Sequence, residues 1–319
     1  MSDIKTVLIT GSTSGIGLSM ATKFAKQGHN IIFNGLEKDG AQTAQSAADE
    51  YGIKHLFYGI DITDSAKVAE MIAGAEKAFG AIDILINNAG VQFVCPVEDF
   101  PEAKWDLILN VNLTAAFHLT KAVWRGMKEK GWGRIINIAS AHGLVASEFK
   151  SAYIAAKHGL VGFTKCIALE GAPYGITANA ICPGYVHTPI VEAQIGDQMA
   201  AHHMNREEVI KKVLLGKQAI KEFIPVNAIS EMALYMASDA AAQMTGTAVP
   251  IDGGWTAQWL QVAPFCLLFF LTKFFSHEVT RSRRALYRKQ SHYPALFGLW
   301  RQRPGHDAAP RPHGQCPRL

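Results

Sequence analysis

The chain has 319 residues, of which 49% are hydrophobic and 18% are charged. This composition supplies a packed core for one or two domains and excludes a disordered polypeptide. The net charge of +4 is uneven: residues 259–319 hold eight Arg and two Lys against two acids, a net of +8, which leaves −4 on residues 1–258. The main body therefore lacks the basic stripe that nucleic acid requires, and we expect no nucleic-acid partner.

The cysteines are scattered along the chain. There are five of them, at Cys95, Cys166, Cys182, Cys266 and Cys316, with no CxxC pair and no metal-ligand spacing. This pattern favours free thiols in a reducing compartment and no metal site. The first ten residues also lack the charged and then apolar leader of a secretory signal. We therefore expect a cytoplasmic protein.

A glycine-rich turn follows the first predicted strand. Residues 6–10 form a short apolar, β-branched run, Gly11, Gly15 and Gly17 come directly after it, and residues 18–27 read as a helix. This order predicts a dinucleotide site, because glycines let the backbone approach a pyrophosphate and the helix N-terminus offers N–H groups and a partial positive charge. The spacing is GxxxGxG rather than GxGxxG, so a plain glycine turn is the alternative interpretation.

The later elements alternate regularly. Further strands are expected at residues 30–34, 55–61, 82–87, 133–139, 177–181 and 248–251, and further helices at 41–51, 65–79, 105–128, 151–169, 207–215 and 228–237. Seven strands separated by helices predict an α/β fold. We expect a single doubly wound, Rossmann-type domain over residues 1–258, with a seven-stranded parallel sheet and helices on both faces. The segment from Thr188 to about Leu215 has no strand signals and is expected to act as a lid over a substrate.

The segment from Ser140 to Lys157 carries the strongest candidates for chemistry. Tyr153 and Lys157 are four residues apart, which places them on one face of a helix. A neighbouring ammonium should lower the pKa of the phenol from about 10 toward the pH at which a general acid and base works. Ser140 ends a predicted buried strand, where an α/β sheet presents reactive side chains. A solvated helix with an unrelated Tyr and Lys is the alternative.

These motifs together resemble the short-chain dehydrogenase/reductase family. The resemblance runs from about residue 4 to 258 and rests on Thr10-Gly11-x-x-x-Gly15-x-Gly17, Asn87-Asn88-Ala89-Gly90, Asn112, Ser140, Tyr153-x-x-x-Lys157 and Pro183-Gly184. It implies that Tyr153 exchanges the substrate proton, that Lys157 holds the nicotinamide ribose and lowers the Tyr153 pKa, and that Ser140 binds the reacting oxygen. It also implies that Asn112 supports a water linking Lys157 to solvent. A structural role at a helix kink is the alternative for Asn112.

The same resemblance implies a nicotinamide cofactor. Its contacts are expected at Gly11, Thr13, Ser14, Gly15, Ile16, Gly17, Leu36, Asp61, Ile62, Asn88, Gly90, Tyr153, Lys157, Pro183, Gly184, Val186 and Thr188. In dinucleotide folds an acid after the second strand binds the ribose hydroxyls, whereas an Arg accommodates a 2′-phosphate. Here Glu37 lies beyond the usual strand end, and no Arg occurs there or in the glycine loop. We expect NAD rather than NADP, with Lys38 as the residue that favours NADP.

Further positions resemble the bacterial D-3-hydroxybutyrate dehydrogenases within this family. They are Gln92, His142, Lys150, Gln194 and Trp255. The resemblance implies that the first four hold a substrate carboxylate, beside Ser140 and Tyr153, and donors of this kind suit a small anionic acid. The alternative interpretation of each polar residue is that it simply faces solvent. Trp255 and Tyr185 either wall the pocket or pack at a subunit contact. We expect reversible, NAD-dependent oxidation of (R)-3-hydroxybutyrate to acetoacetate by a homotetramer.

Two other functions are considered. Another enzyme of the family, such as a 3-oxoacyl-thioester reductase or a sugar or polyol dehydrogenase, is the first. The thioester reductase would favour a basic residue in the glycine loop, which this chain lacks. A non-catalytic dinucleotide-binding sensor is the second, and it should have lost Ser140, Tyr153 or Lys157.

Residues 259–319 differ from the rest of the chain. An apolar run at residues 264–275 is shorter than the roughly 20 residues that span a bilayer, and an Arg-rich segment follows it. We expect an atypical basic tail without a packed fold. Its alternative is a membrane-surface anchor, and membrane contact is expected only if this tail is functional.

Overall fold

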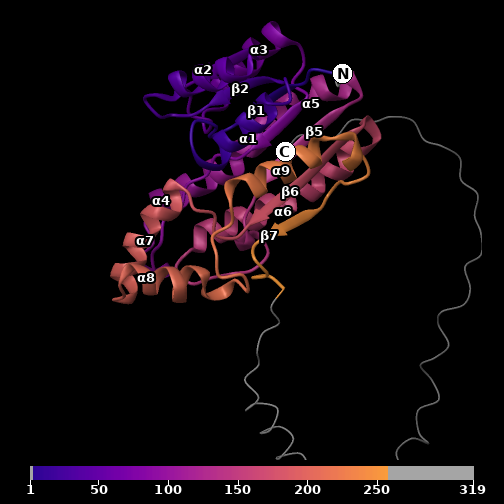
Figure 1. Ribbon diagram of the computed structural model, residues 1–319. Coiled ribbons are helices and arrows are strands. Elements are labelled where there is room, and N and C mark those ends of the chain that lie inside the picture. The colour runs from indigo at the N-terminus through magenta and orange to yellow at the C-terminus, as the bar shows by residue number, and fades with distance from the viewer. Residues whose placement is uncertain (1–2, 258–319) are drawn as a thin grey trace, which may run out of the picture. The chain divides into compact units, whose positions relative to one another are not determined.

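The computed structural model of the protein describes residues 3–257 (Figure 1). Within this range, side chains are not described for Ile190, Ala193, Gln194, Asp197, Ala200, Ala201 and His202. The predicted basic tail, residues 259–319, lies outside the described residues. Residues up to 258 form one compact unit.

Seven parallel strands form one sheet, as the alternating pattern predicts. Their order is β3-β2-β1-β4-β5-β6-β7. The bounds are β1 Thr6–Ile9, β2 Asn30–Asn34, β3 His55–Tyr58, β4 Ile84–Asn87, β5 Gly133–Ile138, β6 Ile176–Pro183 and β7 Ala248–Ile251. The third strand is shorter than expected, so Asp61 lies in the loop that follows it. The doubly wound, Rossmann-type α/β fold is confirmed.

Helices cover both faces of the sheet. The bounds are α1 Gly15–Ala25, α2 Gly40–Tyr51, α3 Ser65–Phe79, α4 Glu102–Leu109, α5 Ala115–Lys130, α6 Ser151–Gly171, α7 Pro189–His202, α8 Arg206–Glu208 and α9 Val226–Ala237. One core joins α1, α2 and α9 to strand residues such as Ile9 and Ile86. The other joins α3, α5 and α6 to Leu8 and Leu85. Successive strand residues point to opposite faces, and helices cover both faces, so apolar residues follow one another in the central strands, as at Ile84, Leu85 and Ile86 of β4.

The long helix expected at residues 105–128 is interrupted. α4 ends at Leu109, a π-helical turn occupies Asn110–Thr114, and α5 follows. In this turn the Asn112 side chain donates to the Val91 carbonyl (2.9 Å) and accepts from the Val91 amide (2.8 Å). A side-chain bond to a distant loop, which the helical pattern does not reveal, accompanies the change in helical winding.

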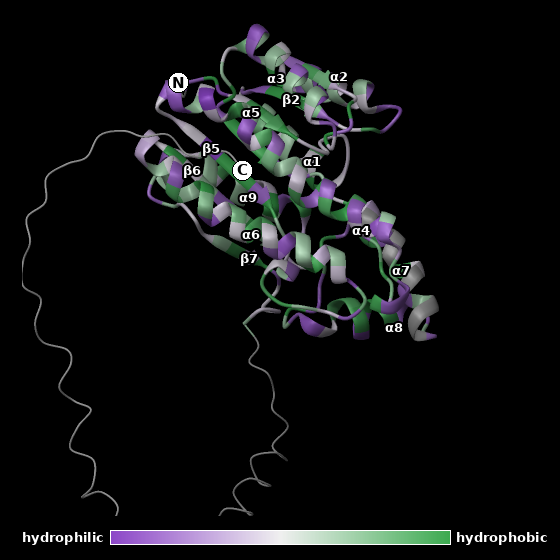
Figure 2. Ribbon diagram, turned by 180° about the vertical axis from the view of Figure 1, so that it is seen from behind, coloured by the Kyte–Doolittle hydropathy of each residue, from purple (hydrophilic) through white to green (hydrophobic). Residues whose placement is uncertain are grey.

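A helix that the sequence analysis did not predict begins after Thr188. The Thr188 hydroxyl accepts from the Val191 amide (3.4 Å), and Pro189 occupies the first helical position of α7. A Thr cap followed by Pro is a recognisable helix start, so the signal was present in the sequence. In both ribbon views α7 and α8 lie at the end of the compact unit far from α2 and α3 (Figures 1 and 2).

None of the helices described within residues 3–257 combines the length and the hydropathy needed to cross a bilayer.

Truncation of a central strand residue tests this packing. Leu85 is fully buried between β4 and the helices of its face. Leu85→Ala should lower the free energy of unfolding by about 3 kcal/mol, because it removes apolar contacts and leaves a cavity. Urea unfolding followed by circular dichroism measures the change. Ile4→Ala, at a residue that is 67% exposed, is the control and should change it by less than about 0.5 kcal/mol. Equal effects of the two variants would contradict the packing described.

Candidate active site

The glycine loop is tied to the carboxyl end of β4. The Thr10 hydroxyl accepts from the backbone amides of Asn88 and Ala89, each at 3.0 Å. In return the Asn88 side-chain amide donates to the carbonyls of Thr10 (2.9 Å) and Gly11 (3.1 Å). Two sequence motifs separated by about 77 positions therefore form one rigid floor at the carboxyl edge of the sheet, where ligands bind in open α/β folds.

Steric constraints explain why two positions of this loop are occupied by glycine. Gly15 has a φ of 51°, a conformation that side chains with a Cβ rarely adopt. A Cβ on Gly17 would lie 2.0 Å from the Gly11 carbonyl oxygen. The loop therefore folds tightly onto the first turn of α1, and the N-terminus of that helix faces the space above it.

A cavity of about 850 Å³ extends along this edge. Most of the expected contact residues line it: Gly11, Ser14, Gly15, Ile16, Gly17, Leu36, Asp61, Ile62, Asn88, Gly90, Gln92, Ser140, His142, Lys150, Tyr153, Lys157, Pro183, Gly184, Val186, Thr188 and Trp255. Thr13 and Asn112 do not line it. The side chain of Gln194 lies outside the described residues. Asn34, Gly35, Ala139 and Val191 also line the cavity, and the motifs gave no signal for them.

Glu37 is a cavity residue whose position the sequence analysis left in doubt. Its carboxylate accepts hydrogen bonds from the hydroxyls of Thr13 and Ser14, the latter at 3.0 Å. Burial raises its pKa, but these hydrogen bonds outweigh burial and hold the pKa below its ordinary value. The carboxylate is therefore charged and fastened to the glycine loop. Thr13, whose hydroxyl makes one of these hydrogen bonds, does not itself line the cavity.

Tyr153 and Lys157 both face the cavity from α6, as their spacing predicts. The Lys157 ammonium lies 5.6 Å from the centre of the Tyr153 ring and donates to the Ile138 carbonyl at 2.8 Å. Ser140 follows β5 and its side chain accepts from the His142 amide at 3.1 Å. Three side chains from β5 and α6 therefore meet in one place.

The predicted direction of the Tyr153 pKa shift is wrong for this structure. Burial raises the pKa of the phenol, and the hydrogen bond with Ser140 opposes this without reversing it. Burial also lowers the pKa of Lys157 to about 8, because a low-dielectric surrounding disfavours both charged forms. Desolvation, which a four-residue spacing does not reveal, outweighs the attraction between the two groups.

Asn112 has the structural role that was the alternative for it. Both ends of its amide are bonded to the backbone of Val91. Its oxygen lies within 3.2 Å of where a Cβ on Gly90 would stand, and Lys157 is the next neighbour of that point at 3.7 Å. The side chain thus fixes the loop after β4 beside Lys157, and the expected water link stays a prediction.

A second group of side chains forms the end of the cavity near Tyr153. The Lys150 ammonium donates to the Tyr185 hydroxyl at 3.3 Å, and the side chains of Tyr185 and Trp255 stack with ring centres 5.5 Å apart. His142 packs edge-on against Trp255 (4.8 Å) and Tyr153 (6.0 Å). Trp255 and Tyr185 therefore form a pocket wall, which was one of the two alternatives for them.

Burial controls the charges at this end. It lowers the pKa of Lys150 to about 8, with a further lowering from Lys217. It also lowers the pKa of His142 to about 3, aided by the charges of Lys150 and Lys217. At neutral pH this end of the cavity thus holds a charged Lys150 and an uncharged imidazole.

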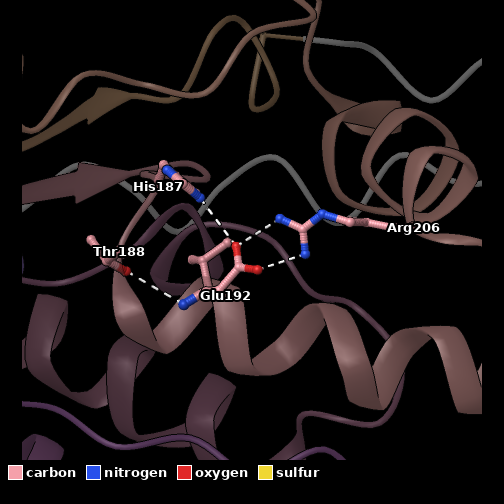
Figure 3. Close-up of polar contacts among 5 residues, drawn as sticks. His187, Thr188, Glu192 and Arg206 are labelled. Atoms are coloured by element: carbon pink, nitrogen blue, oxygen red, sulfur yellow. Dashed lines mark hydrogen bonds and ion pairs between the residues drawn. The ribbon is translucent and has the colours of Figure 1, made fainter.

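The first turn of α7 forms another wall, through Thr188, Pro189 and Val191. Glu192, one residue further, joins this helix to two other segments (Figure 3). Its carboxylate binds both guanidinium nitrogens of Arg206 at 2.5 and 2.9 Å and the His187 ring at 3.1 Å. The bonds from Arg206 and then His187 lower the pKa of Glu192 to about 2. The wall is thereby tied to α8.

The donor set of the cavity suits organic ligands. Among residues 3–257, no cluster of three or more His, Cys, Asp or Glu side chains is placed to hold a metal ion.

Comparisons with known proteins agree on one family. Residues 5–198 match the family model described as short chain dehydrogenase. A D-beta-hydroxybutyrate dehydrogenase of Rhizobium meliloti (strain 1021) is 53% identical over 258 residues, which cover 80% of this chain and 99% of that protein. One from Cupriavidus necator is 48% identical over 254 residues, 80% of this chain and 98% of that protein. The solved structure of an actinorhodin polyketide ketoreductase with NADPH is 31% identical with a TM-score of 0.77, covering 81% of this chain and 99% of that one.

The low pKa of His142 gives a pH-dependent stability. An unfolded chain protonates this imidazole below about pH 6.5, whereas the folded protein does so only near pH 3. The unfolded state thus binds more protons in this window, and stability falls as the pH is lowered through it. Relative to His142→Gln, the wild type should lose up to about 1.4 kcal/mol per pH unit below pH 6.5. Denaturant unfolding at several pH values measures this, and parallel curves for the two proteins would contradict it.

Proposed function

The chain belongs to the short chain dehydrogenase family, and on this premise we propose that it oxidises (R)-3-hydroxybutyrate reversibly to acetoacetate with NAD as the hydride acceptor. The two relatives at 53% and 48% identity that carry the name D-beta-hydroxybutyrate dehydrogenase support this substrate. The alternative activities within the family share the same fold, so the choice depends on the end of the cavity around Lys150.

The cavity fits a dinucleotide. The closely packed glycine loop and the N-terminus of α1 lie where a pyrophosphate needs N–H donors and close backbone approach. Asp61 and Ile62 would border the adenine, Asn88 and Gly90 the ribose side, and Pro183, Gly184, Val186 and Thr188 the nicotinamide. When bound, the nicotinamide supplies the hydride acceptor.

Three side chains would act on the hydroxyl group of the substrate. Ser140 hydrogen-bonds the reacting oxygen and holds it beside Tyr153. Tyr153, as phenolate, takes the hydroxyl proton during oxidation and returns it during reduction. Lys157 holds the ribose and donates from its ammonium to the Ile138 carbonyl, which keeps the charge close to the phenol. Oxidation needs the phenolate form of Tyr153. Burial raises the pKa of this phenol, so the phenolate population, and with it oxidation, should increase as the pH rises.

The observation that carries the substrate proposal is the buried ammonium of Lys150. Its side chain is only 3% exposed, yet it lines the same cavity as Ser140 and Tyr153. An ammonium facing a cavity can form a charge-assisted hydrogen bond with an entering carboxylate, and such a bond is stronger inside a protein than in water. Gln92 and the uncharged His142 line the cavity beside it and add donors. The stacked Tyr185 and Trp255 wall this end of the cavity.

Glu37 supports NAD as the cofactor. Its charged carboxylate lines the cavity beside Ser14 and Gly35, on the side of the second strand. A carboxylate there accepts hydrogen bonds from ribose hydroxyls and repels a 2′-phosphate.

We also propose a homotetramer in the cytoplasm. Phe117 on α5 and Leu169 on α6 are large apolar side chains that are 47% and 78% exposed. Burial of such residues between copies of the chain would be favourable.

The substrate proposal is tested with purified full-length protein and a panel of hydroxy acids. NAD reduction should be fast with (R)-3-hydroxybutyrate and at least tenfold slower with the (S) enantiomer and with the uncharged methyl ester of the (R) acid. Tyr153→Phe should lower kcat by at least 10²-fold with little change in NAD affinity, because it removes the general base but not the cofactor contacts. Absorbance at 340 nm follows turnover, and calorimetry measures NAD binding.

The panel also separates the alternatives. Preferred reduction of an acetoacetyl thioester with NADPH would favour the 3-oxoacyl-thioester reductase and overturn the proposal. Preferred turnover of a polyol would favour the sugar or polyol dehydrogenase. Near-normal activity of Tyr153→Phe would overturn the role of the phenol.

The cofactor proposal is tested at Glu37. Glu37→Gln should lower the ratio of kcat/KM with NAD to that with NADP by about tenfold, equivalent to about 1.4 kcal/mol, because it removes the charge that repels a 2′-phosphate. Glu70→Gln, an exposed carboxylate on α3 outside the cavity, is the matched control and should leave the ratio unchanged. An unchanged ratio in Glu37→Gln would assign cofactor choice to other groups.

A further inference from the structure

A chain of three polar side chains runs from the protein surface to the cavity. The ammonium of Lys217, in the short 3-10 turn Leu215–Lys217, donates to the Ser147 hydroxyl at 3.0 Å. The Ser147 oxygen lies 3.0 Å from Nε2 of His142. His142 lines the cavity, whereas Lys217 and Ser147 do not. Segments about 70 residues apart in sequence therefore meet behind the imidazole.

The directions of these hydrogen bonds follow from the donor inventory. A lysine ammonium has donors only, so Ser147 accepts from Lys217. Within the described part of the chain, the other hydrogen-bond neighbour of the Ser147 oxygen is His142 Nε2. Ser147 has a single hydroxyl proton, and this proton makes a hydrogen bond if Ser147 donates it to Nε2 of His142. In the reverse arrangement Ser147 would accept from both neighbours, and its own proton would have no acceptor among these groups.

A Ser147 hydroxyl that donates to Nε2 requires the ring proton to be on the other nitrogen. Burial lowers the pKa of His142 to about 3, so near neutral pH the imidazole has one N–H donor and one acceptor. With Nε2 accepting from Ser147, the proton resides on Nδ1. Nδ1 has no hydrogen bond to any described residue and is not among the fully buried unsatisfied atoms, so it keeps some exposure on a residue that lines the cavity.

Two aromatic contacts hold the imidazole in place. Trp255 packs edge-on to the His142 ring at 4.8 Å, and the Lys217 ammonium lies 5.7 Å from the centre of the Trp255 ring. Lys217 thus reaches His142 by two routes, through the Ser147 hydroxyl and through the indole that packs on the imidazole.

We propose that Lys217 is a positioning residue that, through Ser147, fixes His142 as the Nδ1–H tautomer, so that the uncharged imidazole donates a hydrogen bond to the carboxylate of the bound hydroxy acid. The proposal rests on the proposed function for the identity of the acid. The opposite tautomer presents a lone pair to the cavity, and a carboxylate placed there is repelled. The relay therefore contributes to selection of an anionic substrate.

Kinetics of relay variants test this in the full chain. Lys217→Met and Ser147→Ala should each raise the KM for (R)-3-hydroxybutyrate about five- to tenfold, the worth of one hydrogen bond to a charged group. The kcat and the KM for NAD should stay within about twofold of the wild type. The double variant should be no worse than either single variant, because both break the same relay. Lys217→Arg and Ser147→Thr keep the donor and the hydroxyl and should retain the wild-type KM.

A matched control separates the relay from charge alone. Lys212→Met removes a cation that pairs with Glu208 on the neighbouring segment and does not contact Ser147, so its KM for the acid should equal that of the wild type. If Lys217→Met raises this KM and Ser147→Ala does not, Lys217 acts by charge and the relay is overturned.

A spectroscopic readout tests the tautomer without substrate. In ¹⁵N-histidine-labelled protein, with the His142 signals assigned from His142→Gln, the wild type should show protonated Nδ1 and unprotonated Nε2. Ser147→Ala and Lys217→Met should give a mixture of tautomers. A protonated Nε2 in the wild type overturns the proposal. If the wild type oxidises no hydroxy acid, the proposed function fails, and this spectrum alone then decides whether the relay fixes the ring.

Discussion

The burial of two lysine ammoniums at one end of a cavity is the constraint on which the chemistry of this protein depends. Lys150 is the N-cap residue of α6, Lys157 follows it by seven residues in the same helix, and burial lowers the pKa of each to about 8. Desolvation disfavours both charges at these buried positions. An anion that enters the cavity therefore interacts with them more favourably than it would with a lysine at the surface. In the proposed function one lysine serves the reacting phenol and the other binds a carboxylate.

The strand order places these cations and the acidic residues at opposite ends of the cavity. Among the described residues that line it, Glu37 and Asp61 follow β2 and β3, while the two lysines pack beside β5 and β6. From β2 to β5 there are three strand spacings, about 14 Å in all. In the proposed function a dinucleotide extends over such a distance, with its ribose hydroxyls at the acidic end and its nicotinamide at the cationic end. The order of the strands thus sets the polarity of the site.

Most of the fold and the glycine-loop base of the site could be predicted from local sequence patterns. Strand alternation, glycine spacing and the Tyr153–Lys157 interval are all short-range features. What escaped prediction depends on groups far apart in sequence. The π-helical turn accompanies Asn112 bonding to Val91, and Glu37 enters the cavity because Thr13 and Ser14 hold it. The Tyr153 pKa depends on how much water the whole fold excludes. The start of α7 is the exception, since Thr188 and Pro189 were a local signal that was overlooked.

The link between Glu192 and Arg206 differs in kind from the bonds beneath the glycine loop. Both side chains are about half exposed, at 45% and 51%, and added salt weakens the attraction within an exposed ion pair. The bonds between Thr10, Asn88 and Gly11 join uncharged groups and are partly buried, so dissolved ions affect them little. Changes in salt concentration therefore loosen the α7 side of the cavity while its base keeps its geometry.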